Sequence, residues 1–250
     1  MKMYIITCDK LINQTMEMIE YVQEKYWPSG DITVLGYKSP TYKSDTIKFN
    51  SLGIDSGPNV VCKQLHDYFS KLEDNHFIFC VDDMPLISSI DDNMIKYVVS
   101  LMKLNSNVGR FGLTLDNMQR SHTVIGRTEN FNVIETVVNQ VNTTVGFGID
   151  AALSYKLSST YSIWNRDYFL LYLNKFNNLW QWESQGSELS GQTDTWKILS
   201  TSIKIIDHAH IFKQGRVKSN WKDSAYNRIT NTDIKMSDED QTKIKEIYNL

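Results

Sequence analysis

Two neighbouring carboxylates form the first group of residues that could do chemistry. Asp82 and Asp83 follow directly after residues 76–81, the most apolar short run of the chain. Adjacent side chains of an extended chain point to opposite sides, so we expect the two aspartates to have different roles. Carboxylate oxygens suit Mg²⁺ or Mn²⁺ held between the protein and a diphosphate. A polar strand end, with one aspartate capping a turn, is the other interpretation that these residues allow.

Another acid, Glu183, follows Trp180 and Trp182 in the segment LWQWESQGSEL. Tryptophan side chains stack on flat apolar faces of ligands, including those of sugar rings. Apolar surroundings raise the pKa of a carboxyl group, which suits it to act as a general base. The segment therefore predicts an apolar surface against which an acceptor sugar packs, with Glu183 beside it as a general base. Two core tryptophans next to a solvated glutamate would give the same composition.

Histidines and basic residues occur close together near residue 210. His208 and His210 share one face if their segment is extended, and no cysteine or further histidine pattern marks a zinc site. We predict that His208 is a single extra ligand to a cation held mainly by Asp83. The basic loop of residues 213–222, which includes Lys218, suits closure over a phosphorylated ligand, although solvated loops have the same composition.

The first half of the chain contains the elements that must position these groups. Short apolar runs at residues 4–7, 32–36, 76–81 and 110–115 predict strands, and apolar positions spaced for helices lie between them. This alternation indicates an α/β protein with a mostly parallel sheet and helices on both faces. Ligands bind such sheets beyond the carboxyl ends of the strands, so we expect the site in the loops after Thr7, Gly36 and Val81.

The second half is less regular. We expect β-like pieces at residues 123–127 and 152–158, a helix from about 165 to 176, a strand at 203–207 and a closing helix whose capping box begins at Ser237. Residues 146–151 formally match a dinucleotide fingerprint, but no strong strand precedes them and no clear helix follows, so a glycine-rich turn is the better interpretation. No linker or repeat is evident, which favours one domain over residues 1–250.

Composition excludes several classes of protein. The chain has 250 residues, 41% of them hydrophobic, which is enough for a substantial core. Its 26 basic and 29 acidic residues give a net charge of −3. A chain with so little net charge has no strong positive potential that would favour binding of nucleic acid or anionic lipid. Three widely spaced cysteines indicate a reducing compartment. No apolar run is long enough for a membrane span and the first residues do not form a signal peptide, so we expect a cytoplasmic protein.

In combination, these segments resemble the nucleotide-sugar-dependent glycosyltransferases of the GT-A fold, and more closely the small bacterial and viral glycosyltransferases of capsular and surface polysaccharide type. The likeness covers roughly residues 1–221 and depends on the order and spacing of short motifs. The matching segments are FCVDDMPL (79–86), which is similar to the family's strand, Asp-Asp and hydrophobic element, YSIWNRDYFL (161–170), WQWE (180–183), LGIDSGPN (52–59) and the basic loop 213–221. One departure is PNV at residues 58–60, where a tryptophan would be expected.

The resemblance implies a GT-A (Rossmann-like) fold in one domain, with a nucleotide-sugar half (1–115) and an acceptor half with a closing segment (116–250). It implies transfer of a sugar from a nucleoside-diphosphate sugar to a hydroxyl of a glycan or surface polysaccharide, with Mn²⁺ or Mg²⁺ as cofactor. A viral member would act in the cytoplasm of its host. The implied roles are donor binding by Thr7, Asp9, Asp55, Asp82 and Lys218, metal binding by Asp83 and His208, proton removal by Glu183, and sugar stacking by Trp180 and Trp182.

Two alternatives remain open at this point. A nucleotidyltransferase also uses a carboxylate-bound metal, but it usually has a glycine-rich and basic loop after the first strand, and residues 8–12 here read CDKLI. A catalytically inactive protein that binds sugars or nucleotides would keep the same fold and tryptophans.

Overall fold

The carboxyl ends of four parallel strands meet at one edge of the sheet. The computed structural model describes residues 1–115, 122–129, 131–136, 156–193, 195–213, 216–217 and 236–249. Strand β1 (Lys2–Ile6) pairs in parallel with β2 (Asp31–Gly36) and β4 (His76–Val81), and β2 pairs in parallel with β3 (Lys48–Ser51). Ile6 is level with both Leu35 and Val81, so the loops that follow these three strands start side by side.

The rest of the sheet is mixed. Strand β8 (Ser162–Asn165) lies between β4 and β5 (Val108–Gly112) and is antiparallel to both. Beyond them lie β9 (Lys197–Thr201), which is parallel to β5, and the antiparallel hairpin of β6 (His122–Arg127) and β7 (Asn132–Thr136). The order of the nine described strands is β3-β2-β1-β4-β8-β5-β9-β7-β6. Strands β10 (Phe212–Lys213) and β11 (Arg216–Val217) form a separate ribbon.

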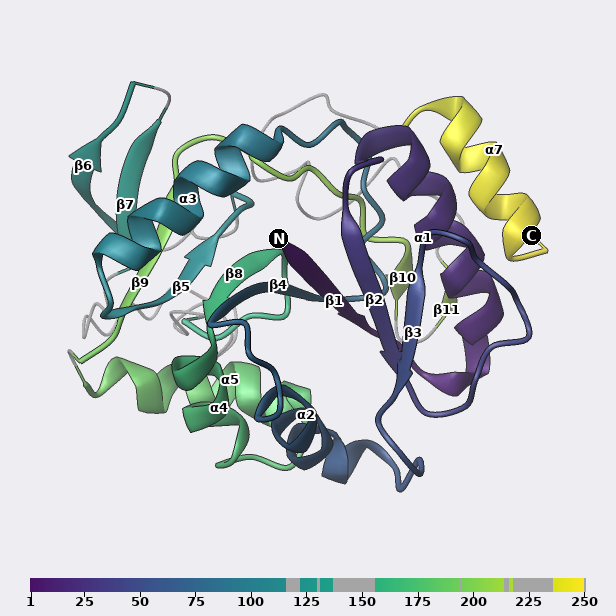
Figure 1. The fold of residues 1–250 in the computed structure, drawn as a ribbon, viewed down its shortest axis with the longest axis horizontal. Coiled ribbons are helices and arrows are strands. Elements are labelled where there is room, and N and C mark those ends of the chain that lie inside the picture. The colour runs from purple at the N-terminus through teal and green to yellow at the C-terminus, as the bar shows by residue number, and fades with distance from the viewer. Residues whose placement is uncertain are drawn as a thin grey trace, which may run out of the picture.

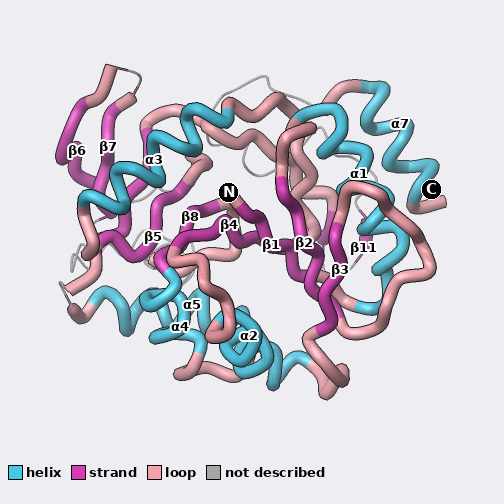
Figure 2. The backbone as a smooth tube through the Cα atoms, in the orientation of Figure 1, coloured by secondary structure: helices cyan, strands magenta, loops and turns pink. Residues whose placement is uncertain are grey.

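Helices cover both faces of this sheet, as Figures 1 and 2 show. On one face lie α1 (Ile12–Tyr26), α3 (Asp92–Leu104) and α7 (Asp238–Ile247), whose apolar residues share a core with the side chains of β1, β2 and β5. On the other lie α2 (Val61–Phe69), α4 (Arg166–Leu173) and α5 (Leu179–Gly191) around an aromatic core. Short 3₁₀ turns, η1 (Asp9–Leu11) and η2 (Pro58–Val60), precede α1 and α2. The predicted α/β class with helices on both faces is confirmed.

Most predicted elements of the first half are present within a few residues of their expected bounds. The strand expected at 203–207 is wrong, because the extended segment lies earlier, in β9, and the backbone then turns so that the amides of Ile205 and Ile206 both donate to the carbonyl of Leu113, at 3.0 Å each. In the piece expected at 152–158, residues 156–158 form no strand, with bends at 156 and 157, and residues 152–155 lie outside the described part of the chain, as do residues 146–151.

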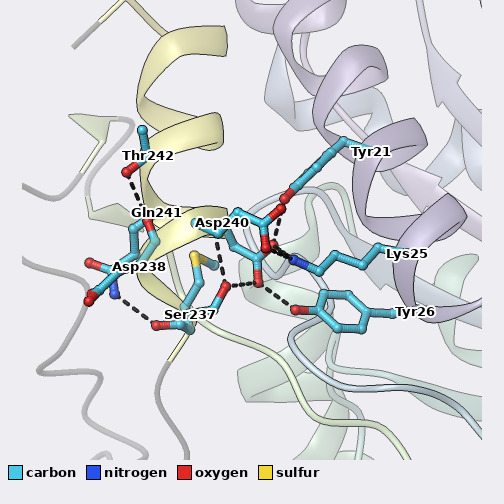
Figure 3. Close-up of polar contacts among 10 residues, drawn as sticks. Tyr21, Lys25, Tyr26, Ser237, Asp238, Asp240, Gln241 and Thr242 are labelled. Carbon is cyan, nitrogen blue, oxygen red and sulfur yellow. Dashed lines mark hydrogen bonds and ion pairs between the residues drawn. The ribbon is translucent and has the colours of Figure 1, made fainter.

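The closing helix α7 begins as predicted, at a capping contact in which the amide of Asp240 donates to Ser237 Oγ (3.1 Å). The buried carboxylate of Asp240 faces α1, where it accepts hydrogen bonds from Tyr21 (2.7 Å), Tyr26 and Lys25 (2.8 Å) (Figure 3). These contacts attach the C-terminal helix to the first one. Among the helices in the described ranges, none has the length and hydropathy needed to cross a membrane.

Candidate functional site

Thr7 and Asp82 stand next to each other at the carboxyl ends of β1 and β4. The amide of Thr7 donates to Leu35 O (2.9 Å) and the amide of Asp82 to Ile6 O (3.1 Å), which extends the ladder by one residue on each strand. The Asp82 carboxylate accepts a hydrogen bond from Thr7 Oγ1 at 2.5 Å and from Thr15 Oγ1, near the start of α1, at 3.4 Å. Asp82 therefore joins β4 to β1 and α1.

Burial is the main influence on the acidity of Asp82. It raises the pKa of this carboxyl to about 6, with a smaller contribution from the charge of Asp83, whereas the hydrogen bond from Thr7 acts in the opposite direction. The hydroxyl partners of Asp82 favour its ionised form, and so oppose the effect of burial.

Asp83 lies in a different environment, as the alternation of an extended chain predicts. Its side chain is 31% exposed, Oδ1 has no hydrogen-bond partner in the described part of the chain, and Oδ2 lies 3.9 Å from His210 Nδ1. An unpartnered carboxylate oxygen at a sheet edge is a candidate ligand for a cation.

The loop that carries Asp83 is held on both sides. Residues 205–211 run alongside it: the amide of Ile211 donates to Asp83 O (3.0 Å), that of Ala209 donates to Pro85 O (3.1 Å), and Leu86 forms a bridge with His208. On the other side, the Tyr161 hydroxyl donates to Met84 O at 2.5 Å.

His208 is buried beside the loop that carries Asp83. Its ring is 3% exposed and packs 5.6 Å from the ring of Tyr161 and 5.1 Å from that of His210. The bridge with Leu86 fixes His208 beside this loop, and His210 Nδ1 lies 3.9 Å from Asp83 Oδ2, so His210 is a second candidate ligand, while the role of His208 as a ligand stays a prediction. No group of three or more histidine, cysteine or acidic side chains in the described ranges could hold a metal ion unaided.

Glu183, on α5, is held by the segment that precedes β8. Its Oε1 accepts hydrogen bonds from both the amide and the hydroxyl of Ser159, the second at 2.7 Å. Within the described ranges no hydrogen bond reaches Oε2. The carbonyl of Ser159 accepts from the amide of Val81 (3.2 Å). Ser159 therefore connects Glu183 to the last residue of β4. Burial raises the pKa of Glu183, the bonds from Ser159 and the charge of Arg110 oppose the shift, and the charge of Asp83 adds to it.

The two tryptophans beside Glu183 have separate environments. Trp182 is fully buried in the aromatic core against Phe79, Trp164 and Phe169, so the prediction that it stacks on a sugar is wrong. Residues two apart on a helix point to different faces, and the α5 helix separates the pair for that reason. Trp180 is 72% exposed, three residues before Glu183, and keeps a free face.

Asp9 and Asp55 lie near Tyr37, at the ends of the first three strands. Asp9 Oδ1 accepts from the amides of Tyr37 (3.1 Å) and Lys38 (2.8 Å). Asp55 is exposed, and its Oδ1 accepts from the amide of Gly57 (2.8 Å), whose φ of 87° suits glycine. Burial, and then the charges of Asp55 and Asp9, raise the pKa of Tyr37 to about 12. Lys218 lies outside the described residues.

Sequence reasoning assigned no role to three residues of this site: His210, Ser159 and Arg110. Arg110 is fully buried in β5, and a charged residue inside a predicted core strand was the signal that could have identified it. Nothing in the local pattern distinguishes Ser159 from the other hydroxyl residues around it.

Among known proteins, only solved structures of low sequence identity were found to be similar to this chain. No family model and no curated protein matches the chain. The solved structure of CMP:2-keto-3-deoxy-manno-octonic acid synthetase complexed with CTP is 10% identical, with 82% of this chain and 90% of that one covered and a TM-score of 0.41. Apo UDP-glucose pyrophosphorylase is 13% identical, with coverages of 84% and 92% and a TM-score of 0.46.

The glycosyltransferase GlyE of Streptococcus pneumoniae TIGR4 is 8% identical, with 76% of this chain covered and a TM-score of 0.34. This chain spans 36% of the GlyE chain. At these identities and TM-scores the likenesses carry no argument about the substrate or the reaction of this protein.

Proposed function

We propose that this protein is a glycosyltransferase that moves a sugar from a nucleoside-diphosphate sugar to an acceptor hydroxyl of a glycan or surface polysaccharide. The observation that carries the proposal is a pair of unlike carboxylates at one sheet edge. Asp83 offers an unpartnered oxygen, whereas Glu183 is half-buried, held at Oε1 and without a hydrogen bond at Oε2 in the described ranges. The first suits binding of a charged donor and the second suits removal of a proton.

Acidic side chains surround this edge, since Asp9, Asp55, Asp82 and Asp83 all follow the ends of β1, β3 and β4. A diphosphate would be repelled by them unless a cation lay between. The unpartnered oxygen of Asp83 is a donor that Mn²⁺ or Mg²⁺ accepts, and the imidazole of His210 is a further donor that suits Mn²⁺ better than Mg²⁺, so the residues fit such an ion, and the diphosphate and water would complete its ligands. When bound, the ion would stabilise the negative charge that develops on the departing nucleoside diphosphate.

The chain's own residues divide the remaining work. Ser159 orients Glu183 so that Oε2 can take the proton of the acceptor hydroxyl, and burial keeps the pKa of this acid high enough for that task. The exposed face of Trp180 offers a surface on which an acceptor sugar can stack. Thr7 and Thr15 hold Asp82 in place beneath the donor.

A thermal-shift and product experiment tests the proposal. UDP and GDP sugars are added with Mn²⁺ or with a chelator, and released nucleoside diphosphate is measured in the presence of simple glycosides. A ligand at about 100 times its dissociation constant stabilises by roughly 2.7 kcal/mol, which raises the melting temperature of a chain of this size by roughly 5–10 °C. We expect this shift and product release only with the metal.

The other outcomes assign other functions. Pyrophosphate release from a nucleoside triphosphate and a sugar 1-phosphate, with no turnover of nucleotide sugars, would make the protein a nucleotidyltransferase. A metal-dependent shift without any turnover would make it a binding protein. The absence of a shift with every nucleotide would remove the donor site from this edge of the sheet.

A further inference from the structure

Arg110 is a buried cation in β5, next to β8 in the sheet. Its side chain is fully buried, and the guanidinium lies 5.5 Å from the ring of Trp164 on the neighbouring strand. Nε donates to Ser162 Oγ (2.8 Å), one terminal nitrogen donates to Thr160 Oγ1 (3.3 Å), and the other approaches the carbonyl of Lys156 (3.5 Å). A buried charge is retained only where it has partners of this kind.

All three of these acceptors belong to the segment 156–162, which leads into β8. The segment also makes its own polar contacts, because Ser162 Oγ donates to Thr160 O (3.0 Å) and the hydroxyls of Ser158 and Thr160 lie 3.1 Å apart. It therefore wraps around the planar guanidinium, whose fixed donor directions determine where each residue of the segment lies.

Ser159, in the middle of this segment, holds the proposed base. Ser159 donates its amide and hydroxyl to Glu183 Oε1, and its carbonyl accepts from Val81, next to Asp82. The contacts thus run from Arg110 through the segment to Glu183 on one side and to the end of β4 on the other.

We propose that Arg110 is a positioning residue: its guanidinium folds the segment 156–162 so that Ser159 fixes the Glu183 carboxylate with Oε2 directed to the acceptor. This inference rests on the proposed function for its catalytic meaning. Arg110 also acts on Glu183 by charge, because its positive charge favours the ionised carboxylate while the negative charge of Asp83 opposes it.

The test compares Arg110→Lys with Tyr168→Phe as a matched control. Lysine keeps the positive charge but has no planar fork to reach three acceptors. Tyr168 is equally buried in the same core, and Tyr168→Phe removes one hydroxyl contact, to Ser190 at 2.7 Å, without touching the segment. The readouts are the titration of Glu183 by NMR of ¹³Cδ-labelled glutamate, assigned with Glu183→Gln, and the pH profile of sugar transfer.

We expect Arg110→Lys to raise the pKa of Glu183, to shift the acid limb of the pH profile with it, and to lower turnover on the order of 10- to 100-fold, since small misplacements of a reacting group have effects of this size. Tyr168→Phe should lower the melting temperature and leave the titration and the profile unchanged. If Arg110→Lys does not fold, Ser162→Ala, which removes only the acceptor of Nε, should shift both readouts in the same direction by a smaller amount.

A folded Arg110→Lys variant with the wild-type titration and profile would overturn the inference, because a merely structural arginine changes stability alone. The NMR titration needs no substrate. A shifted Glu183 in a protein without any transferase activity would therefore support the positioning role while refuting the proposed function. Normal sugar transfer by the wild type, together with an unchanged Glu183 titration in Arg110→Lys, would support the proposed function and refute the positioning role.

Discussion

Replacing Asp240 by asparagine tests how the C-terminal helix is held on the rest of the protein. The Asp240 carboxylate is 1% exposed and accepts hydrogen bonds from Tyr21, Tyr26, Lys25 and Ser237 (Figure 3). Asparagine has nearly the same shape but carries no charge. The substitution therefore removes the ion pair with Lys25, at 2.8 Å, while most of the packing between α7 and α1 stays in place.

The acidity of Asp240 gives the size of the effect. Burial opposes its ionisation, but the hydrogen bonds from Lys25, Ser237, Tyr26 and Tyr21 outweigh burial and lower the pKa from 3.8 to about 2. A carboxyl group with such a shift contributes about 2 kcal/mol to the free energy of unfolding at neutral pH. For a chain of this size, we expect Asp240→Asn to lower the melting temperature by roughly 4–8 °C.

The sign of the pH dependence follows from the same shift. Because the pKa is lower in the folded state, the contribution is fully present above the unfolded-state value near 4 and is lost as the pH falls through the folded-state value. The difference in unfolding free energy between wild type and Asp240→Asn should be constant from pH 7 to about 5 and should shrink between about pH 4 and pH 2.

Urea denaturation of both proteins from pH 3 to pH 7 measures this difference, with Glu239→Gln as the control. Glu239 also pairs with Lys25 at 2.8 Å, but its side chain is 76% exposed, and exposed pairs contribute at most about 1 kcal/mol. If Asp240→Asn is no less stable than Glu239→Gln at pH 7, or if the difference does not change below pH 4, the buried ion pair does not hold α7 as argued.

Three further predictions concern the site and its scaffold. Asp83→Ala should fold normally and lose the metal-dependent thermal shift with nucleoside diphosphates; an unchanged shift would place the cation elsewhere. Glu183→Gln should reduce turnover on the order of 10²- to 10⁴-fold while nucleoside-diphosphate affinity stays near the wild-type value; near-normal turnover would mean that Glu183 is not the base. In Gly109→Ala the new Cβ would lie 2.4 Å from Tyr168 Cγ, so we expect a loss of about 1–3 kcal/mol in urea denaturation. Gly126→Ala, whose nearest atom is 4.0 Å away, should lose less, and equal losses would contradict the packing.

Much of the first half of the molecule, and the start of its last described helix, could be predicted from local patterns. The apolar run 76–81 becomes β4 and places Asp82 and Asp83 at the carboxyl edge, and the serine at the start of the last helix caps it as the capping box indicates. These features depend on neighbours a few residues apart. Hydrophobic periodicity and capping chemistry therefore determine them before any long-range contact forms.

The placement of the second half depended on contacts that no local pattern contains. The insertion of β8 between β4 and β5 brings Arg110 to the segment 156–162 and Ser159 to Glu183. In the same way, the bridge that places His210 at Asp83 joins residues more than a hundred positions apart in the chain, and the helical form of α5 sends Trp182 into the core.

The sequence by itself determined which residue types reach the carboxyl edge of the sheet, because the length and period of the apolar runs establish where each strand ends. Only the tertiary structure decided which partners those residues meet. Strand order and side-chain burial are set by the packing of the whole chain, and a one-residue change of register or of helix face moves a side chain from the site into the core. For that reason Asp83 could be found in the sequence, whereas the contacts made by His210, Ser159 and Arg110 could not.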